Sequence, residues 1–295
     1  RVDIGAGAER VVIPADADDL AAVLAEAPGA TMVAGATDVG LWVTKRSRPV
    51  GATVMVGRIP ELRRIEDRPE GLTLGAAVTY AEAEAPLLAR FPQLAELWSR
   101  IGGPQVRAAG TIGGNIANGS PIGDCPPAFI ALGARLTLRR GAARRTLPLE
   151  SFFLDYGLQD RAADEFVESV FLRALGPDDR LAVYKVSKRR DEDITAVCGA
   201  FLLRLDGGRV AQARLAYGGM AGTPRRAPAA EAALTGAVWG LEAAERAAAA
   251  LACDFTPLTD MRASAAYRAR VAANLLIRFA LEDAGEPVRL AGGVA

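Results

Sequence analysis

The sequence predicts an α+β protein built from more than one compact unit. The chain has 295 residues, of which 51% are hydrophobic, and a single domain typically takes about 100–200 residues. Short apolar segments with strand character alternate with helical patterns through the first two thirds, and a hairpin signal followed by two long helical patterns fills the last third. We therefore expect two or three units, each with strands and helices of its own.

The first predicted unit covers residues 1–65 and has a β-α-β-β order. Asp16 is placed to cap a helix that follows the first strand, because a carboxylate before an apolar helical pattern satisfies free backbone N–H groups. Pro28-Gly29 ends this helix. Strands are expected at 11–14, 31–35 and 53–57.

The second predicted unit covers residues 66–177. Its second helix should end at Gly102-Gly103-Pro104, and a glycine-rich loop over 110–124 follows. The expected elements are a strand at 72–76, helices at 80–90 and 94–101, and strands at 135–139 and 166–172.

The third predicted unit covers residues 178–295, after a boundary near Gly176-Pro177. Two apolar segments flank Asp206-Gly207-Gly208, a typical hairpin signal. Helices are expected at 241–251 and 262–282, and the apolar face of the second should pack on the hairpin sheet through Tyr267, Val271, Leu275, Ile277, Phe279 and Leu281.

Charge and hydropathy exclude several classes of protein. Lys and Arg number 35, equal to Asp and Glu, so no overall field attracts nucleic acid or an anionic membrane. No apolar run reaches the roughly 18–20 residues of a membrane span, and the N-terminus has no secretion-signal pattern. We expect a cytoplasmic protein. Because the first residue is Arg1, we also expect a piece of a longer or processed chain.

The histidine and cysteine content limits the chemistry further. The chain has no histidine, which excludes Ser-His-Asp catalysis and His-ligated zinc within it. Its three cysteines, Cys125, Cys198 and Cys253, are too few for a four-thiolate cluster. We expect reduced thiols and no metal held by this chain.

The stretch 110–124 is dominated by small and turn-forming residues and ends in Asp124. Glycine lets backbone amides point into one concavity, which suits a phosphate, and a carboxylate can accept from a sugar or ribityl hydroxyl. The stretch matches neither the Walker loop nor the dinucleotide fingerprint, so a structural loop stays an alternative. A second glycine turn, 33–40, has the same chemistry, and two such turns can clamp one long diphosphate.

Several motifs in order along the chain resemble one family. They are the turn Val33-Ala34-Gly35-Ala36-Thr37-Asp38-Val39-Gly40, the stretch Thr111-Ile112-Gly113-Gly114-Asn115-Ile116 with Ser120-Pro121-Ile122-Gly123-Asp124, the segment Tyr184-Lys185-Val186-Ser187-Lys188-Arg189-Arg190, then Tyr217-Gly218-Gly219-Met220-Ala221 and residues 262–268. Together they resemble the flavin-binding module of xanthine dehydrogenases, in the molybdenum hydroxylase family.

The resemblance implies a fold and a set of site residues. The fold is a vanillyl-alcohol-oxidase-like (PCMH-type) FAD-binding pair of subdomains, followed by an α+β domain like the C-terminal domain of carbon monoxide dehydrogenase flavoproteins. Asp124 would contact the FAD sugar or ribityl chain, and Lys185 and the backbone of Val167 would lie by the flavin. The remaining implied contacts are Met32, Val33, Ala34, Gly35, Ala36, Thr37, Asp38, Val39, Thr111, Gly113, Gly114, Asn115 and Asn118.

Ile101 departs from the pattern, because some relatives have an aromatic residue against the flavin there. An aliphatic contact and a plain core position at a helix end both stay open for Ile101. For the segment from Lys185 to Asp193 the alternative is a solvated charged loop, and the role of Lys188-Arg189-Arg190 in NAD binding is left open.

The family also implies a function. Electrons from 2Fe-2S clusters would collect on FAD and leave as hydride to NAD+, in the oxidation of hypoxanthine or xanthine at a molybdenum cofactor. The clusters and the molybdenum cofactor would belong to other domains or chains: an upstream iron-sulfur domain and a molybdenum-binding subunit, in a hetero-oligomer such as a dimer of heterodimers. The flavin would carry the chemistry, with no certain catalytic side chain.

Three alternatives remain. One is the medium subunit of a sister enzyme, of carbon monoxide dehydrogenase or aldehyde oxidase type, with a quinone or other acceptor. The segment Ala34 to Asp38 favours the xanthine dehydrogenase form over a doubled-glycine form. The others are an autonomous flavin oxidase and a non-catalytic assembly module.

Overall fold

The computed structural model describes residues 1–189 and 192–288. The chain divides into two compact units. The N-terminal unit consists of Arg1–Ser120 and Gly133–Ala174, and the C-terminal unit of Pro121–Leu132 and Leu175–Ala295. Both contain helices and strands, as the α+β prediction requires. The predicted boundaries at residues 65 and 177 stay predictions.

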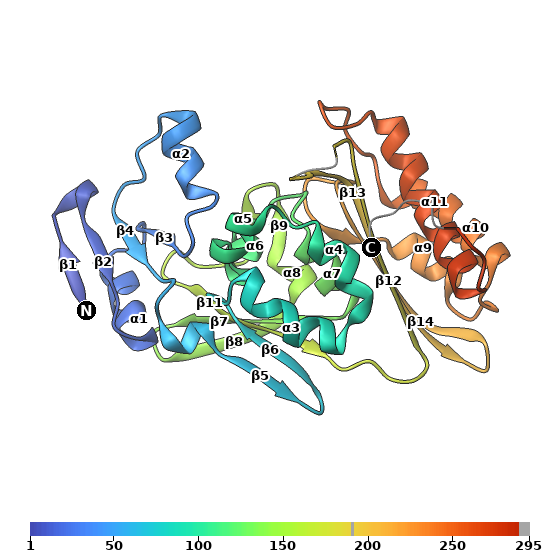
Figure 1. Ribbon diagram of the computed structural model, residues 1–295, viewed down its shortest axis with the longest axis horizontal. Helices are drawn as coiled ribbons and strands as arrows, with labels where there is room; N and C mark the ends of the chain where they lie inside the picture. The colour runs from blue at the N-terminus through green and yellow to red at the C-terminus, as the bar shows by residue number, and fades with distance from the viewer. Residues whose placement is uncertain (190–191, 289–295) are drawn as a thin grey trace. The chain divides into compact units, whose positions relative to one another are not determined.

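The first sheet of the N-terminal unit mixes parallel and antiparallel pairs, in the order β1-β2-β4-β3 (Figure 1). The helix α1 (Ala17–Glu26) connects β2 to β3, and the Asp16 carboxylate accepts from the N–H of Asp19 at 2.8 Å, as a capping residue does. Leu20 and Val23 of α1 are buried. The strands are Val2–Ile4, Val11–Ile13, Thr31–Val33 and Thr53–Met55, and α2 (Val39–Arg46) lies between β3 and β4.

The second sheet is antiparallel, in the order β5-β6-β11-β7-β8. Its strands are Ile65–Arg68, Gly71–Gly75, Phe166–Arg173, Arg135–Arg140 and Ala143–Pro148 in that order. The helix α3 (Tyr80–Arg90) begins where predicted, because Thr79 and Glu82 form a reciprocal capping box. Beyond α3 come α4 (Ala95–Ser99), α5 (Pro104–Ala109), α6 (Ile112–Asn118), α8 (Leu149–Phe152), β9 (Phe153–Asp155) and β10 (Leu158–Gln159).

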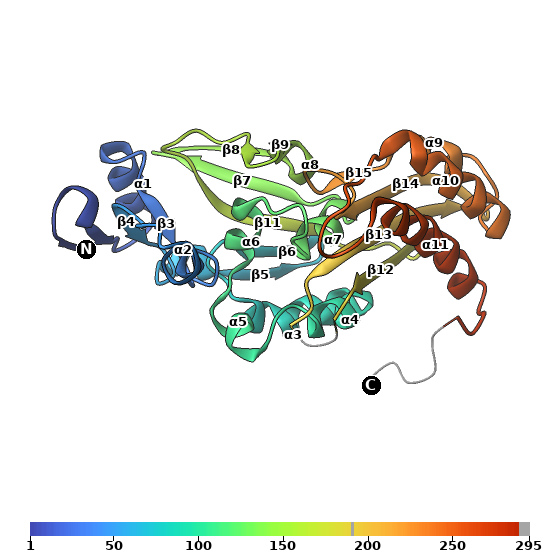
Figure 2. The ribbon, with the colours of Figure 1, turned by 90° about the horizontal axis from the view of Figure 1, so that it is seen from above.

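The C-terminal unit is built on an antiparallel sheet in the order β12-β13-β14-β15, in which the first three strands are long (Figure 2). The strands of this sheet are Asp179–Ser187, Thr195–Asp206, Arg209–Gly218 and Arg225–Arg226. The predicted hairpin is confirmed: Asp206 pairs with Arg209, and Gly207 and Gly208 have φ of 54° and 78°, as a tight primed turn requires.

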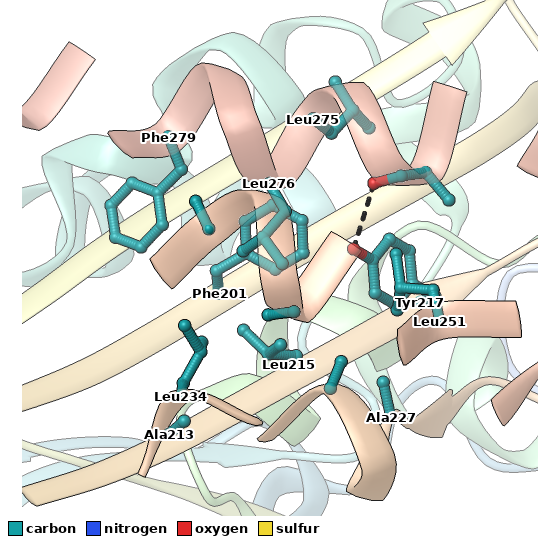
Figure 3. Packing of buried hydrophobic residues seen from close by; sticks show 14 of the residues in the cluster. Phe201, Ala213, Leu215, Tyr217, Ala227, Leu234, Leu251, Leu275, Leu276 and Phe279 are labelled. Carbon is teal, nitrogen blue, oxygen red and sulfur yellow. Dashed lines mark hydrogen bonds between the residues drawn. The ribbon is translucent and has the colours of Figure 1, made fainter. Parts of the chain in front are cut away.

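Helices cover both faces of this sheet. The helices α9 (Pro228–Leu234), α10 (Leu241–Asp254) and α11 (Ala265–Asp283) share one hydrophobic core with alternate residues of β13 and β14. Figure 3 shows Phe201 and Tyr217 of the strands near α11, with Leu215 in the same cluster. The Tyr217 hydroxyl donates to the Ala272 carbonyl of α11 at 3.1 Å. On the other face lies α7 (Cys125–Ala131), where Arg214 donates to the Ile130 carbonyl at 2.7 Å.

Several predicted elements were wrong in detail. The stretch 110–124 is not one loop, because α6 occupies its centre and α7 follows its end. Adjacent glycines disfavour a helix, but the Thr111 cap, with burial of Ile112 and Ile116, outweighs that cost. The helices α2, α5 and α9 and the strands β1, β5, β8 and β12 were not predicted, residues 92–94 form a 3-10 turn, and the last helix starts at residue 265.

Candidate functional site

The two glycine-rich segments meet inside the N-terminal unit. A Cβ on Gly35 would lie 1.6 Å from the carbonyl oxygen of Ala109, which immediately precedes Gly110. No side chain fits in that space, so only glycine allows the turn after β3 to touch the end of α5. The backbone of the turn after β3 therefore contacts the residue that precedes the 110–124 stretch. That the two segments clamp one diphosphate stays a prediction.

The turn after β3 offers a row of free donors. No backbone N–H from Gly35 to Asp38 donates a hydrogen bond to any residue that the structure describes. Ala36 has φ of 58°, a left-handed conformation that is uncommon outside glycine. Successive amides in a turn with such a residue form an anion-binding concavity, so the turn can accept a phosphate.

Unlike the N–H groups of the turn after β3, the backbone N–H groups at the start of α6 donate hydrogen bonds within the protein. Gly113 donates to the Ala76 carbonyl at 2.8 Å, and Gly114 donates to the Thr111 hydroxyl at 3.1 Å. These two N–H groups therefore already have acceptors within the protein, the Ala76 carbonyl and the Thr111 hydroxyl; that Gly113 and Gly114 contact the cofactor stays a prediction. The Asn115 side chain differs: its Oδ1 is buried and has no partner among the described residues. A donor from a ligand would satisfy this acceptor.

Val167 lies at a β-bulge in β11, where the register with β7 shifts between Val167 and Ser169. The Glu168 carbonyl in this bulge accepts from the N–H of Ala76 at 3.0 Å. Because the Ala76 carbonyl accepts from Gly113, two hydrogen bonds connect the bulge to α6. Bulges redirect the backbone next to functional sites.

The other predicted cofactor contacts of the N-terminal unit lie in several different helices and strands. Ile101 is 5% exposed and follows α4, in agreement with the alternative of a core position. Asn118 is exposed near the end of α6. Met32 and Val33 belong to β3, and Val39 starts α2. That these residues bind a cofactor stays a prediction.

The C-terminal unit brings Asp124 and Lys185 together. Asp124 precedes α7, Lys185 lies in β12, and the Lys185 ammonium is 2.7 Å from Asp124 Oδ2. Two residues that the sequence analysis did not single out complete the cluster. Asp193 Oδ1 lies 3.3 Å from the ammonium, and the Thr195 hydroxyl donates to Asp124 Oδ1. Only the tertiary contact distinguishes Asp193 from the neighbouring acids of its segment.

Burial controls the electrostatics of this cluster. Loss of water raises the pKa of the Asp124 carboxyl above its ordinary value, although Lys185 and the Thr195 hydroxyl favour its ionised form. The Lys185 side chain is fully buried, so its charge needs both carboxylates.

The segment after β12, which ends at Ser187, is a charged loop. Lys188 donates to the Met261 carbonyl at 3.4 Å, and Arg189 donates to the Glu192 carbonyl at 2.7 Å, with both cations exposed. Arg190, for which a role in NAD binding was also left open, lies outside the described residues.

Two features are absent from the residues that the structure describes. No helix there is long and apolar enough to cross a membrane. No group of three or more His, Cys, Asp or Glu residues within residues 1–189 and 192–288 could hold a metal ion.

Comparison with known families gives two matches. Residues 7–173 match the FAD binding domain in molybdopterin dehydrogenase, and residues 182–283 match the CO dehydrogenase flavoprotein C-terminal domain. The chain belongs to this flavoprotein family. It is an FAD-binding component of the molybdenum hydroxylase group, which confirms the predicted fold class.

Curated relatives of this family differ in length. The chain is 32% identical to the carbon monoxide dehydrogenase medium chain of Hydrogenophaga pseudoflava, over 76% of this chain and 78% of that one. It is 30% identical to the nicotinate hydroxylase hnxS of Emericella nidulans and 31% identical to the xanthine dehydrogenase/oxidase of Gallus gallus, over 91% and 73% of this chain. It spans only 22% and 17% of the lengths of those two relatives.

Solved structures show the same fold. Carbon monoxide dehydrogenase from Hydrogenophaga pseudoflava, in a form without the Mo-pyranopterin moiety, matches with a TM-score of 0.84 and 32% identity over 92% of this chain and 95% of that chain. Quinoline 2-oxidoreductase from Pseudomonas putida 86 matches with a TM-score of 0.82 at 24% identity, over 96% and 99% of the two chains, a likeness of fold alone.

The residues of the flavoprotein site fit FAD. The free amides from Gly35 to Asp38 suit a diphosphate, and the orphaned Asn115 oxygen can accept from a ligand donor.

Proposed function

We propose that this flavoprotein is the FAD-carrying electron-transfer part of a xanthine dehydrogenase, with NAD+ as the acceptor, acting in the oxidation of hypoxanthine and xanthine. The turn from Gly35 to Asp38 carries the proposal, because its four unpartnered amides face no protein acceptor in the described chain. They provide the fixed positive ends of dipoles that a diphosphate needs.

The side chains and backbone of this chain would hold the cofactor and orient it. The turn would bind the diphosphate, Asn115 would accept from a neighbouring group, and Asp124 would accept from a sugar or ribityl hydroxyl. Lys185 would hold the Asp124 carboxylate by its ion pair. FAD, when bound, accepts electrons singly and delivers them as a hydride.

The remaining redox centres would lie outside this chain. The 2Fe-2S clusters would be in an iron-sulfur domain, and the molybdenum cofactor in another domain or subunit of a cytoplasmic hetero-oligomer. The nicotinate hydroxylase of Emericella nidulans and the xanthine dehydrogenase/oxidase of Gallus gallus support such an arrangement, because this chain spans only 22% and 17% of their lengths.

The choice of xanthine dehydrogenase rests on finer features. The turn Ala34-Gly35-Ala36-Thr37-Asp38 has a single glycine, the form that we associate with xanthine dehydrogenases, and the Gallus gallus relative has 31% identity. A medium subunit of carbon monoxide dehydrogenase type is the second candidate. The Hydrogenophaga pseudoflava medium chain supports it, because the match covers 78% of that chain.

Flavin content and acceptor kinetics test the proposal. The purified protein should contain FAD, and after anaerobic reduction it should be reoxidised by NAD+ faster than by oxygen or quinone in parallel stopped-flow measurements. Faster reoxidation by quinone would favour the second candidate, and faster reoxidation by oxygen an autonomous flavin oxidase. Protein that neither contains nor takes up FAD would be an assembly module.

A further inference from the structure

The charged side chains in the buried cluster of Asp124, Lys185, Asp193 and Thr195 differ in how far they are exposed to solvent. The Asp193 side chain is 2% exposed, the Lys185 side chain is not exposed at all, and the Asp124 side chain is 14% exposed. Among these three charged side chains, only Asp124 reaches the surface of the C-terminal unit. Asp193 cannot meet a ligand, but its carboxylate still interacts with the ammonium.

The geometry fixes the Asp124 carboxylate at both oxygens. Lys185 holds Oδ2 at 2.7 Å, and the Thr195 hydroxyl donates to Oδ1. A carboxylate oxygen accepts more than one hydrogen bond, so each oxygen keeps capacity for a donor from outside. Lys185 and Thr195 therefore set the direction from which such a donor can approach the carboxylate.

Asp193 in turn holds Lys185. Burying a charge that is incompletely paired costs free energy. With Asp124 as its single carboxylate partner, the Lys185 ammonium would therefore pull Asp124 inward or move out toward solvent. With Asp193 at 3.3 Å the ammonium has a second anionic partner.

We propose that Asp193 and Thr195 are positioning residues, which fix Asp124 for contact with a hydroxyl of FAD. This inference rests on the proposed FAD site. Both residues act through Asp124: Thr195 directly, and Asp193 by way of Lys185.

Equilibrium FAD binding to the deflavinated protein, prepared with its native partner chains, tests the proposal. Asp193→Asn and Thr195→Val should each raise the FAD dissociation constant about tenfold, the effect of losing a charge-assisted hydrogen bond. Thr195→Ser keeps the hydroxyl and should bind FAD as the unsubstituted protein does. Glu231→Gln is the matched control, since Glu231 is a buried carboxylate of the same unit that is paired with Arg226; it should leave FAD affinity unchanged.

A double-substitution cycle separates positioning from general destabilisation. In an Asp124→Asn background, Asp193→Asn should weaken FAD binding no further, because its effect passes through Asp124. An equal further loss in that background would overturn the inference, as would unchanged affinity in both Asp193→Asn and Thr195→Val. If the unsubstituted protein takes up no FAD, the proposed function itself is wrong.

Discussion

At the scale of single residues, the meeting of Gly35 with Ala109 sets the shape of the candidate phosphate site. Glycine alone fits there, since a methyl group would overlap the Ala109 carbonyl oxygen. Five residues later, a methyl group on Gly40 would have no neighbouring atom within 4 Å, and the φ of Gly40 is ordinary. Gly35 in the turn and Gly40 in α2 therefore differ in what they tolerate.

Gly35→Ala should lower the free energy of unfolding by about 1–3 kcal/mol, the usual cost of overpacking, and should abolish FAD uptake. Gly40→Ala should be neutral or stabilising by up to about 1 kcal/mol, because alanine is the better helix former. Denaturant titration and flavin absorbance measure both. Equal effects of the two substitutions would mean that the close approach does not matter.

Asp260 gives a prediction about pH. Although desolvation opposes it, the N–H groups of Arg262 and Ala263 and the Arg268 guanidinium lower the pKa of Asp260 to about 2. A carboxyl with a lowered pKa in the folded state contributes stability above its unfolded pKa, near 4, and loses it as the pH falls to about 2. Asp260→Asn should therefore flatten the fall in denaturant midpoint between about pH 4 and 2 relative to the unsubstituted protein. Parallel curves for the two proteins would contradict this.

At the scale of elements, the helix α11 illustrates how far an apolar pattern predicts packing. Leu275 and Phe279 are buried as predicted, whereas Tyr267 is 50% exposed and Leu276 is fully buried. The apolar pattern predicts the helix but not the rotation about its axis, which the shape of the sheet beneath it decides.

Leu276→Ala should therefore cost about 2–5 kcal/mol of unfolding free energy, the range for truncating a buried leucine. Tyr267→Ala on the same helix should cost less than about 0.5 kcal/mol. Chemical denaturation followed by circular dichroism compares them. A larger loss for Tyr267→Ala would show that the exposed face is occupied in solution.

At the scale of the whole molecule, the chain crosses between its units more than once. Residues 121–132 carry α7 onto the sheet of the C-terminal unit, and the chain then returns to β7 of the N-terminal unit. The hydrogen bonds from Arg214 to Ile130 and from Gly219 to Pro121 hold this segment.

A protein of residues 175–295 alone should consequently be less stable and less soluble than one in which residues 121–132 are joined to it by a flexible linker, because α7 covers one face of β13 and β14. Thermal unfolding and size-exclusion chromatography measure the difference. Identical behaviour would show that α7 is dispensable for this unit.

The sequence by itself determined the α+β class, most strands, the capped helices and the hairpin, because caps, glycine turns and apolar periodicity act over a few residues. Its motif order also determined the family. Only the tertiary structure decided that 110–124 contains a helix with occupied amides, that Gly35 to Asp38 carry the free donors, and that Asp193 and Thr195 join Asp124 and Lys185. These features depend on contacts between residues far apart in the chain, and no local pattern encodes which partner a buried polar group will find.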